Sequence, residues 1–299
     1  MITQEIKQKI AEAIRERASM YPSSAKYATK LGINKSILSR ILNGETEKVL
    51  DNARWVTIAR ILDVNIGGQS NWVVAETPVY IYVTEQLTAC QRQSISGLLC
   101  DRADIGKSFA AKQYVRNHAN AIYVDCSQVK CKTKLIRAIA KEFGLDCRGR
   151  YADVYADLVF YLKGISNPLV VLDEAGDLEY TAFLELKGLW NATEYTCGWY
   201  MMGANALRHK IDTMIERRRV GYEEIFSRYG QRYQRITPES SQEYKDFALA
   251  QVALVAKANG STLPPTKMFA ATGGSLRRVH TELTKAVETR QCHVSTHED

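Results

Sequence analysis

An octapeptide at residues 101–108 has the residue types and spacing of a phosphate-binding loop. Asp101-Arg-Ala-Asp-Ile-Gly-Lys-Ser108 occupies the frame G-x-x-x-x-G-K-[ST], between an apolar run and a helical pattern. In such a loop, backbone N–H groups and a helix N-terminus point at phosphate oxygens. Lys107 is expected to reach the β- and γ-phosphates, and the Ser108 hydroxyl to bind Mg²⁺. We therefore predict ATP and Mg²⁺ as cofactors, with the nucleotide held by Arg102, Ala103, Asp104, Ile105, Gly106, Lys107, Ser108 and Phe109.

Two acidic residues differ from this sequence pattern. Asp101 replaces its first glycine, and Asp104 stands where a second glycine is common. Carboxylates beside a triphosphate repel it, and a side chain restricts the backbone angles that glycine allows. Asp101 is therefore expected either to turn away from the phosphates or to pair with Arg102, and nucleotide binding is expected to be weaker than usual.

A second motif supplies the carboxylates that ATP hydrolysis needs. Four apolar residues, 169–172, lead into Asp173 and Glu174. We predict that Asp173 lies in the Mg²⁺ shell and that Glu174 activates the attacking water. Taken alone, the run also fits a buried strand that reaches a helix cap. Its distance from Lys107, with one strand between them, favours the nucleotide site.

The elements around these motifs predict an α/β fold. Apolar strands are expected at residues 95–100, 121–126, 169–172 and 199–203, and helices between them. This alternation indicates a mostly parallel, doubly wound sheet. We divide the chain into a small all-α helix-turn-helix domain (1–66), a linker (67–78), an ATPase core (79–237) and a C-terminal helical lid (238–299).

Residues 24–44 fit the helix-turn-helix template. Ala28 is small where two helices cross, and Gly32 falls in the turn. The second helix, 34–42, then presents polar side chains outward to phosphates and base edges. A three-helix module that docks a protein is the alternative. The predicted DNA-binding residues of this helix are Lys35, Ser36, Ser39 and Arg40, whereas Trp55 is assigned to the core.

Composition restricts the class of protein. The chain has 299 residues and a net charge of +7, and residues 1–66 hold 11 Lys/Arg against 7 Asp/Glu, which favours a polyanionic partner for this part. No apolar run is long enough to cross a bilayer and no secretory segment is present, so we expect a cytoplasmic protein without a membrane partner. Seven cysteines without a C-x-x-C pair indicate reduced thiols rather than disulfides or a zinc site.

Five segments in order carry a family resemblance: GKSFAAKQYVRNHANAIYVDCSQ, LVVLDEAGDL, WYMMGANALR, FSRYGQRY and GGSLRRVHTEL. Over residues 70–299 the chain resembles the AAA+ family of transposition ATPases, whose members include the B protein of phage Mu, TnsC and IstB. The chain length and the N-terminal helix-turn-helix point to the Mu B branch.

The resemblance implies further roles. Asn205 matches the polar sensor that orients the attacking water. Arg228 matches the arginine finger that reaches the γ-phosphate of a neighbouring subunit, and the run 217–219 is its rival. Arg277 matches the lid arginine that contacts nucleotide, with Arg278 as its rival. A finger acting in trans requires a ring or a helical filament of this chain.

A loop at residues 127–134, here called the lysine loop, follows the second strand. In related ATPases this loop faces the central channel and follows a DNA backbone, so its cations are expected to make sequence-independent, salt-sensitive contacts. A solvated helix start is the alternative. The residues concerned are Lys130, Lys132 and Lys134.

The resemblance implies an ATP-dependent, largely non-specific ATPase that oligomerises on double-stranded DNA. Such a protein selects target DNA for a DDE transposase and stimulates that enzyme, and DNA stimulates its ATP hydrolysis. Two alternatives stay open. One is a helix-turn-helix regulator whose degenerate site binds nucleotide without hydrolysing it. The other is a AAA+ loader for replication or repair.

Overall fold

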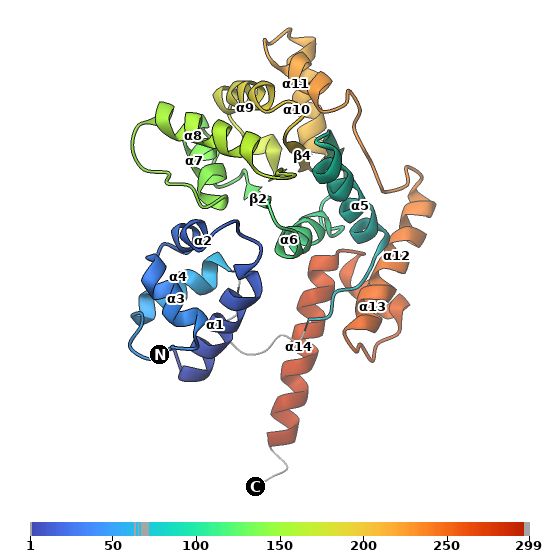
Figure 1. Cartoon of the computed structure of the whole chain (residues 1–299). Helices are drawn as coiled ribbons and strands as arrows, with labels where there is room; N and C mark the ends of the chain where they lie inside the picture. The colour runs from blue at the N-terminus through green and yellow to red at the C-terminus, as the bar shows by residue number, and fades with distance from the viewer. Residues whose placement is uncertain (1, 63, 65, 67–71, 296–299) are drawn as a thin grey trace.

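The computed structural model describes residues 2–62, 64, 66 and 72–295 (Figure 1). Its centre is a parallel sheet in the order β1-β4-β3-β2. The strands are β1 (Ser96–Cys100), β2 (Ala121–Asp125), β3 (Leu169–Asp173) and β4 (Gly198–Gly203). The predicted α/β fold with a parallel sheet is confirmed.

An isolated parallel β-bridge between Gln234 and Leu99, which the sequence analysis did not predict, lies on the free side of β1. The N–H of Gln234 donates to the carbonyl of Leu98 at 2.8 Å, and the N–H of Cys100 donates to the carbonyl of Gln234 at 3.1 Å. This contact leads the chain from the ATPase core past the carboxyl end of β1 and toward the C-terminal helices.

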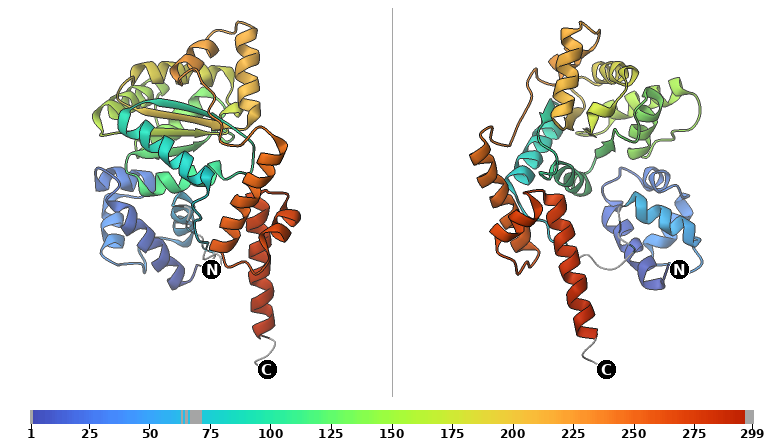
Figure 2. Two further views of the ribbon diagram at one scale, coloured as in Figure 1. Left: turned by 90° about the vertical axis from the view of Figure 1, so that its right-hand side faces the viewer. Right: turned by 180° about the vertical axis from the view of Figure 1, so that it is seen from behind.

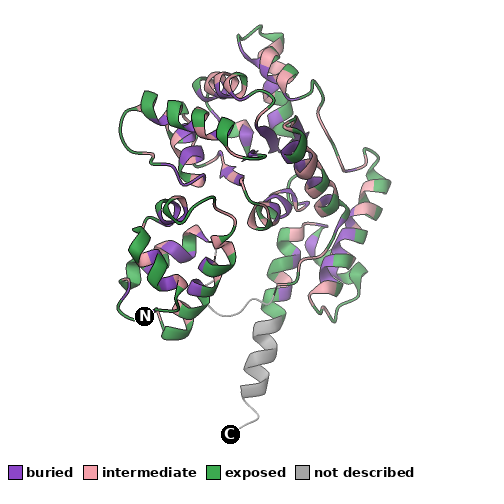
Figure 3. Ribbon diagram, viewed as in Figure 1, coloured by how far each residue is buried: buried purple, intermediate pink, exposed green. Residues whose placement is uncertain are grey.

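Buried residues are concentrated on the strands and on the helices around them (Figure 3). The strand side chains alternate between two apolar cores, one on each face of the sheet. Leu98 and Val170 point to one face, while Leu99 and Val171 point to the other, as the period of two in a strand requires. Helices α5 (Pro78–Gln93) and α6 (Lys107–Asn117) cover the second face (Figure 2). The first face packs against α7 (Lys132–Glu142), α8 (Tyr151–Gly164), α9 (Tyr180–Ala192), α10 (Asn205–Glu216) and α11 (Tyr222–Arg228).

The first four helices enclose a core of their own. They are α1 (Gln4–Ala18), α2 (Ser24–Leu31), α3 (Lys35–Leu42) and α4 (Asn52–Ile61). Trp55 is fully buried there, as predicted. Gly32 ends α2 with a left-handed φ of 70°, and the Asn34 side chain caps α3 by accepting from the Ile37 N–H at 2.9 Å. The turn between α2 and α3 thus has specific stop and start residues.

Helix α2 also joins this helical unit to the ATPase core. The ammonium of Lys30, which is almost completely buried, pairs with the Glu142 carboxylate at the end of α7. Burial lowers the pKa of Lys30, and the Glu142 charge opposes that shift. Lys26 lies 4.7 Å from the ring centroid of Tyr161. The exposed face of α3 is left outside this contact.

The C-terminal helices form a fourth core from α12 (Ser241–Ala258), α13 (Pro265–Thr272) and α14 (Leu276–Ser295). Residues 67–71 of the predicted linker lie outside the described residues. The rest of it is not a free connection, because Val73 exchanges hydrogen bonds of 2.8 and 3.0 Å with Asn259 and the Trp72 ring lies 4.6 Å from His280. Among the described helices, none is both long and apolar enough to span a bilayer.

We predict that Gly198→Ala lowers the free energy of unfolding by about 1–3 kcal/mol. A Cβ at this position would lie 2.3 Å from the Cys90 carbonyl oxygen, where α5 crosses β4. Urea unfolding followed by circular dichroism measures the effect. Gly164→Ala is the control, because its Cβ would meet open space, and helix propensity favours alanine there. Equal urea midpoints for wild type and both variants would contradict the prediction.

Candidate nucleotide site

The loop between β1 and α6 has the backbone of a phosphate-binding loop. Gly106 has a φ of 102° and Asp104 a φ of 61°, both left-handed. Gly106 is the N-cap of α6, and as a glycine it brings no side chain to the helix N-terminus. Within the described residues, the N–H groups of residues 103–109 donate no hydrogen bond to the protein. A run of unpaired donors at a helix N-terminus fits the oxygens of a polyphosphate.

Lys107 lies inside the curve of this loop. Its ammonium donates to the carbonyl oxygens of Asp101 at 2.9 Å and Arg102 at 2.5 Å. Burial lowers the pKa of Lys107, and the charges of Asp101, Asp173 and Glu174 act in the opposite direction. The predicted phosphate-binding lysine and the two predicted catalytic carboxylates therefore share one site.

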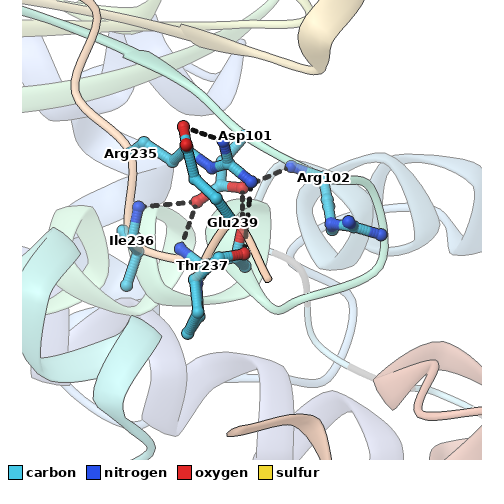
Figure 4. Close-up of polar contacts among 7 residues, drawn as sticks. Asp101, Arg102, Arg235, Ile236, Thr237 and Glu239 are labelled. Atoms are coloured by element: carbon cyan, nitrogen blue, oxygen red, sulfur yellow. Dashed lines mark hydrogen bonds and ion pairs between the residues drawn. The ribbon is translucent and has the colours of Figure 1, made fainter. Parts of the chain in front are cut away.

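Asp101 points away from the space that the loop encloses (Figure 4). Its Oδ2 accepts from the N–H groups of Ile236 at 2.7 Å and Thr237 at 2.8 Å, and its Oδ1 accepts from the Thr237 hydroxyl. Burial raises the pKa of this carboxyl, but the hydrogen bonds more than compensate, so the pKa is lowered. Of the two expectations, the turned-away carboxylate agrees with the structure. The Arg102 guanidinium stacks 4.0 Å from the Tyr244 ring instead of pairing with Asp101.

Asp104 binds the start of α14. Its carboxylate pairs with Arg277 at 3.2 Å and accepts from the Ser275 hydroxyl at 3.2 Å. Its carbonyl oxygen accepts from the N–H of Leu276 at 3.1 Å. Arg278 donates instead to the Ala271 carbonyl. Between the two candidate lid arginines, only Arg277 contacts the phosphate-binding loop.

The carboxylates Asp173 and Glu174 lie at the end of β3. Asp173 is buried and accepts from the N–H of Glu174 at 2.9 Å. Glu174 is exposed and has a left-handed φ of 49°. Burial, followed by the charge of Asp173, raises the pKa of Glu174. A carboxylate with a raised pKa beside a phosphate site is suited to accept a proton from water.

Tyr123 on β2 is a site residue that sequence reasoning missed. Its hydroxyl donates to Oδ2 of Asp173 at 2.6 Å, and the Ser108 hydroxyl lies near enough to oppose the rise in the pKa of Tyr123. Burial and the charge of Asp173 raise the pKa of Tyr123, which keeps it protonated. Tyr123 thus connects the two predicted Mg²⁺ ligands. Hydroxyl and carboxylate oxygens are donors that Mg²⁺ prefers, so the residues present fit this ion.

Asn205 and Arg228 lie at opposite ends of the sheet. Asn205 is the exposed first residue of α10, just past the carboxyl end of β4. The Arg228 guanidinium donates to Asn191 at 2.6 Å and lies 5.5 Å from the Trp190 ring. The indole of Trp190 donates to Ser96, the first residue of β1. A five-residue strand is about 13 Å long, so Arg228 lies far from the loop of its own chain.

The predicted DNA contacts are exposed in two places. On α3 these are Lys35, Ser36, Ser39 and Arg40; Arg40 pairs with Glu45 at 2.7 Å and the Ser36 hydroxyl donates to Asn34. In the lysine loop they are Lys130, Lys132 and Lys134. Lys130 pairs with Asp177 at 3.3 Å.

Comparisons with known proteins agree with this geometry. Residues 91–211 match the sequence model of a family described as AAA domain. The ORC2 protein of Aeropyrum pernix (ADPNP-ADP complexes) has a TM-score of 0.51 and 16% identity, covering 75% of this chain and 66% of that one. No match was found among curated proteins. The domain match and the ORC2 likeness show a AAA+ fold.

Two further structures are similar at lower TM-scores. The Aeropyrum pernix ORC1 protein in complex with DNA has a TM-score of 0.46 and 17% identity, covering 61% of this chain and 50% of that one. CDC6P from Pyrobaculum aerophilum has a TM-score of 0.47 and 18% identity, covering 64% and 52%. The chain thus spans about half to two thirds of the length of these structures.

We predict that Asp101→Gly, which restores the glycine of the frame, destabilises the protein by about 2 kcal/mol, because donors to a buried carboxylate lose their acceptor. The folded-state pKa of Asp101 lies below the ordinary 3.8, so its contribution is complete above that pH and is lost as the pH falls through the folded pKa. Urea unfolding at pH 7 and about pH 3 should show the difference shrinking.

Asp104→Gly is the matched control for this experiment. Asp104 has a left-handed φ that favours glycine, and its partner Arg277 is 83% exposed. We therefore expect a change within about 1 kcal/mol. The assignment of Asp101 would be wrong if both variants had the same stability at pH 7.

We predict that Tyr123→Phe raises the Mg²⁺ concentration needed for half-maximal ATP turnover by about tenfold, because residues behind metal ligands orient them. Titration of Mg²⁺ at fixed ATP measures this shift, and urea unfolding checks that the fold is intact. Tyr80→Phe, on α5, is the control. An unchanged Mg²⁺ curve for Tyr123→Phe would refute the role.

Proposed function

We propose that this protein binds and hydrolyses Mg-ATP and couples the nucleotide to binding of double-stranded DNA. The observation that carries the proposal is the convergence of Lys107, the Ser108–Tyr123–Asp173 contacts and Glu174 at the carboxyl ends of β1 and β3. The ORC2 structure, of the same fold, was determined as ADPNP-ADP complexes, which supports nucleotide binding here.

Each residue has a separate task in this proposal. The N–H groups of residues 103–109 and the Lys107 ammonium bind phosphate oxygens. Ser108 and Asp173 hold Mg²⁺, which supplies charge neutralisation on the phosphates. Glu174 takes the proton of the attacking water, and Asn205 orients that water. Arg277, now paired with Asp104, is close enough to the loop for the lid to respond to nucleotide.

The position of Arg228 supports an assembly of several copies. Since Arg228 lies at the far end of β1 from its own loop, a contact with γ-phosphate requires a neighbouring subunit. Arg217, Arg218 and Arg219, all exposed, are the rivals for this role. A ring or a helical filament of this chain places each finger at the next nucleotide.

DNA binding is proposed for two surfaces with different tasks. The lysine loop supplies contacts to phosphates that do not depend on sequence, and α3 supplies a second, tethered contact. ATP between subunits aligns the lysine loops along the duplex, and hydrolysis releases them. From the resemblance to transposition ATPases, we propose that the bound DNA is a target for a DDE transposase.

A AAA+ loader for replication or repair is the second candidate, and the ORC2 likeness is the observation in its favour. The two functions differ in the partner enzyme. Binding of the purified protein to a DDE transposase, rather than to a replicative helicase, supports target selection; the reverse result supports the loader.

The hydrolysing function is tested by Glu174→Gln. We expect turnover to fall by about a hundredfold or more, because the general base is lost, while ATP binding is retained and DNA is released more slowly. Turnover is measured with and without duplex DNA, which should stimulate the wild type. Glu85→Gln, an exposed change on α5, serves as the control.

Undetectable turnover for the wild type under both conditions would favour the non-hydrolysing regulator. In the sequence, the carboxylates Asp101 and Asp104 are the features that favour that alternative. Asp101 faces Thr237 and Asp104 pairs with Arg277, so neither carboxylate is left as an unpaired charge beside the phosphates.

A further inference from the structure

A further basic surface, apart from α3 and the lysine loop, lies where α10 ends. A cleft of about 440 Å³ opens there between α10 and the starts of α9 and α11. Three of its side chains are cations and two are tyrosines, and no carboxylate is among the described residues that line it. The lining residues are Tyr180, Lys210, Met214, Arg217, Arg219 and Tyr222.

The turn after α10 brings two of these cations to the cleft. Arg218 has a left-handed φ of 52°. Its N–H donates to the Ile215 carbonyl and the next N–H donates to the Met214 carbonyl, both at 2.8 Å. This turn directs Arg217 and Arg219 into the lining, whereas Arg218 does not line the cleft.

The two arginines keep donors available for an anion. The Arg219 guanidinium stacks on Tyr180 at 4.2 Å, and stacking uses the face of the group rather than its N–H edge. The Tyr180 hydroxyl donates to the Val220 carbonyl at 3.0 Å, which fixes the ring. Within the described part of the chain, no ion pair joins Arg217 or Arg219 to a carboxylate.

Only the short segment of residues 176–179 separates the cleft from the lysine loop, and both sides contact it. Lys210 donates to the carbonyl oxygens of Gly176 at 2.7 Å and Leu178 at 2.6 Å. From the other side, Lys130 pairs with Asp177, and its carbonyl accepts from the Glu179 N–H at 2.9 Å. A backbone that follows the lysine loop therefore passes the cleft as well.

We propose that this cleft binds phosphodiester groups of the same duplex that the lysine loop contacts. The inference rests on the proposed DNA-binding function. It adds a second binding site for the DNA backbone beside the lysine loop. Its size accommodates a phosphate with its sugar rather than a whole duplex. A free nucleotide offers the same phosphate chemistry, so the experiment includes an arm for that source.

The test measures duplex DNA binding by the full-length protein with a slowly hydrolysed ATP analogue, using fluorescence anisotropy at several salt concentrations. For Arg217→Gln/Arg219→Gln we expect the Kd to rise about tenfold or more. The slope of log Kd against log salt should fall by about 2, because each lost phosphate contact removes about 0.9.

Two controls separate the cleft from general charge effects. Arg148→Gln removes a cation that is 88% exposed and paired with Asp146, far along the chain between α7 and α8. Arg92→Gln removes an exposed cation of α5, which covers the other face of the sheet. Both should stay within about threefold of the wild-type Kd.

Three results would overturn the inference. The double variant could keep the wild-type Kd and slope. It could bind DNA normally but lose DNA-independent turnover, which would assign the arginines to a subunit contact. Finally, Lys107→Ala could still bind ATP in calorimetry, with that binding lost when the double change is added; the ligand would then be a free nucleotide.

The failure of the proposed function is distinguishable from these outcomes. If wild type shows no nucleotide-dependent DNA binding, and Lys132→Gln changes nothing, the DNA-binding function itself fails. If wild type binds and Lys132→Gln weakens binding while the double variant does not, only the cleft assignment fails.

Discussion

The buried carboxylate of Asp101 joins the parts of the ATPase core that meet at the nucleotide site. It accepts from the backbone of Ile236 and Thr237, which lie 135 and 136 residues later in the chain. An acceptor without solvent is costly unless it is saturated, and here each oxygen receives more than one donor. The loop between β1 and α6 is thereby attached to the segment that leads into the lid.

That attachment explains why a residue that departs from the phosphate-binding frame is tolerated. A glycine at position 101 would leave the loop free to approach phosphate, but it would also leave the N–H groups of Ile236 and Thr237 without this acceptor. Asp104 makes the complementary contact, since it pairs with Arg277 on α14. Asp101 therefore connects the loop with the segment that leads into the C-terminal helices, and Asp104 connects the loop with α14 itself.

Local patterns in the sequence predicted the elements well, because helices and strands follow from residue spacing. The apolar runs at 169–172 and 199–203 became β3 and β4, and Gly32 and Asn34 mark the turn between α2 and α3. Lys107, Ser108, Asp173 and Glu174 converge because parallel strands end at one edge. Their catalytic roles stay predictions.

The contacts that the sequence did not predict join residues of separate elements, and no local sequence pattern links these residues. Tyr123 alternates with apolar neighbours on β2 in the same way as any half-buried strand residue. Its backbone is in register with Val171, and only the packing of β2 beside β3 brings its hydroxyl within reach of Asp173, two residues further along. Lys30 occupies a helix position that is normally solvated, yet the Glu142 carboxylate allows its burial. Such pairs depend on how separate elements pack. A side chain therefore acquires a role in this site from its three-dimensional neighbours, even where the motif assigns it none.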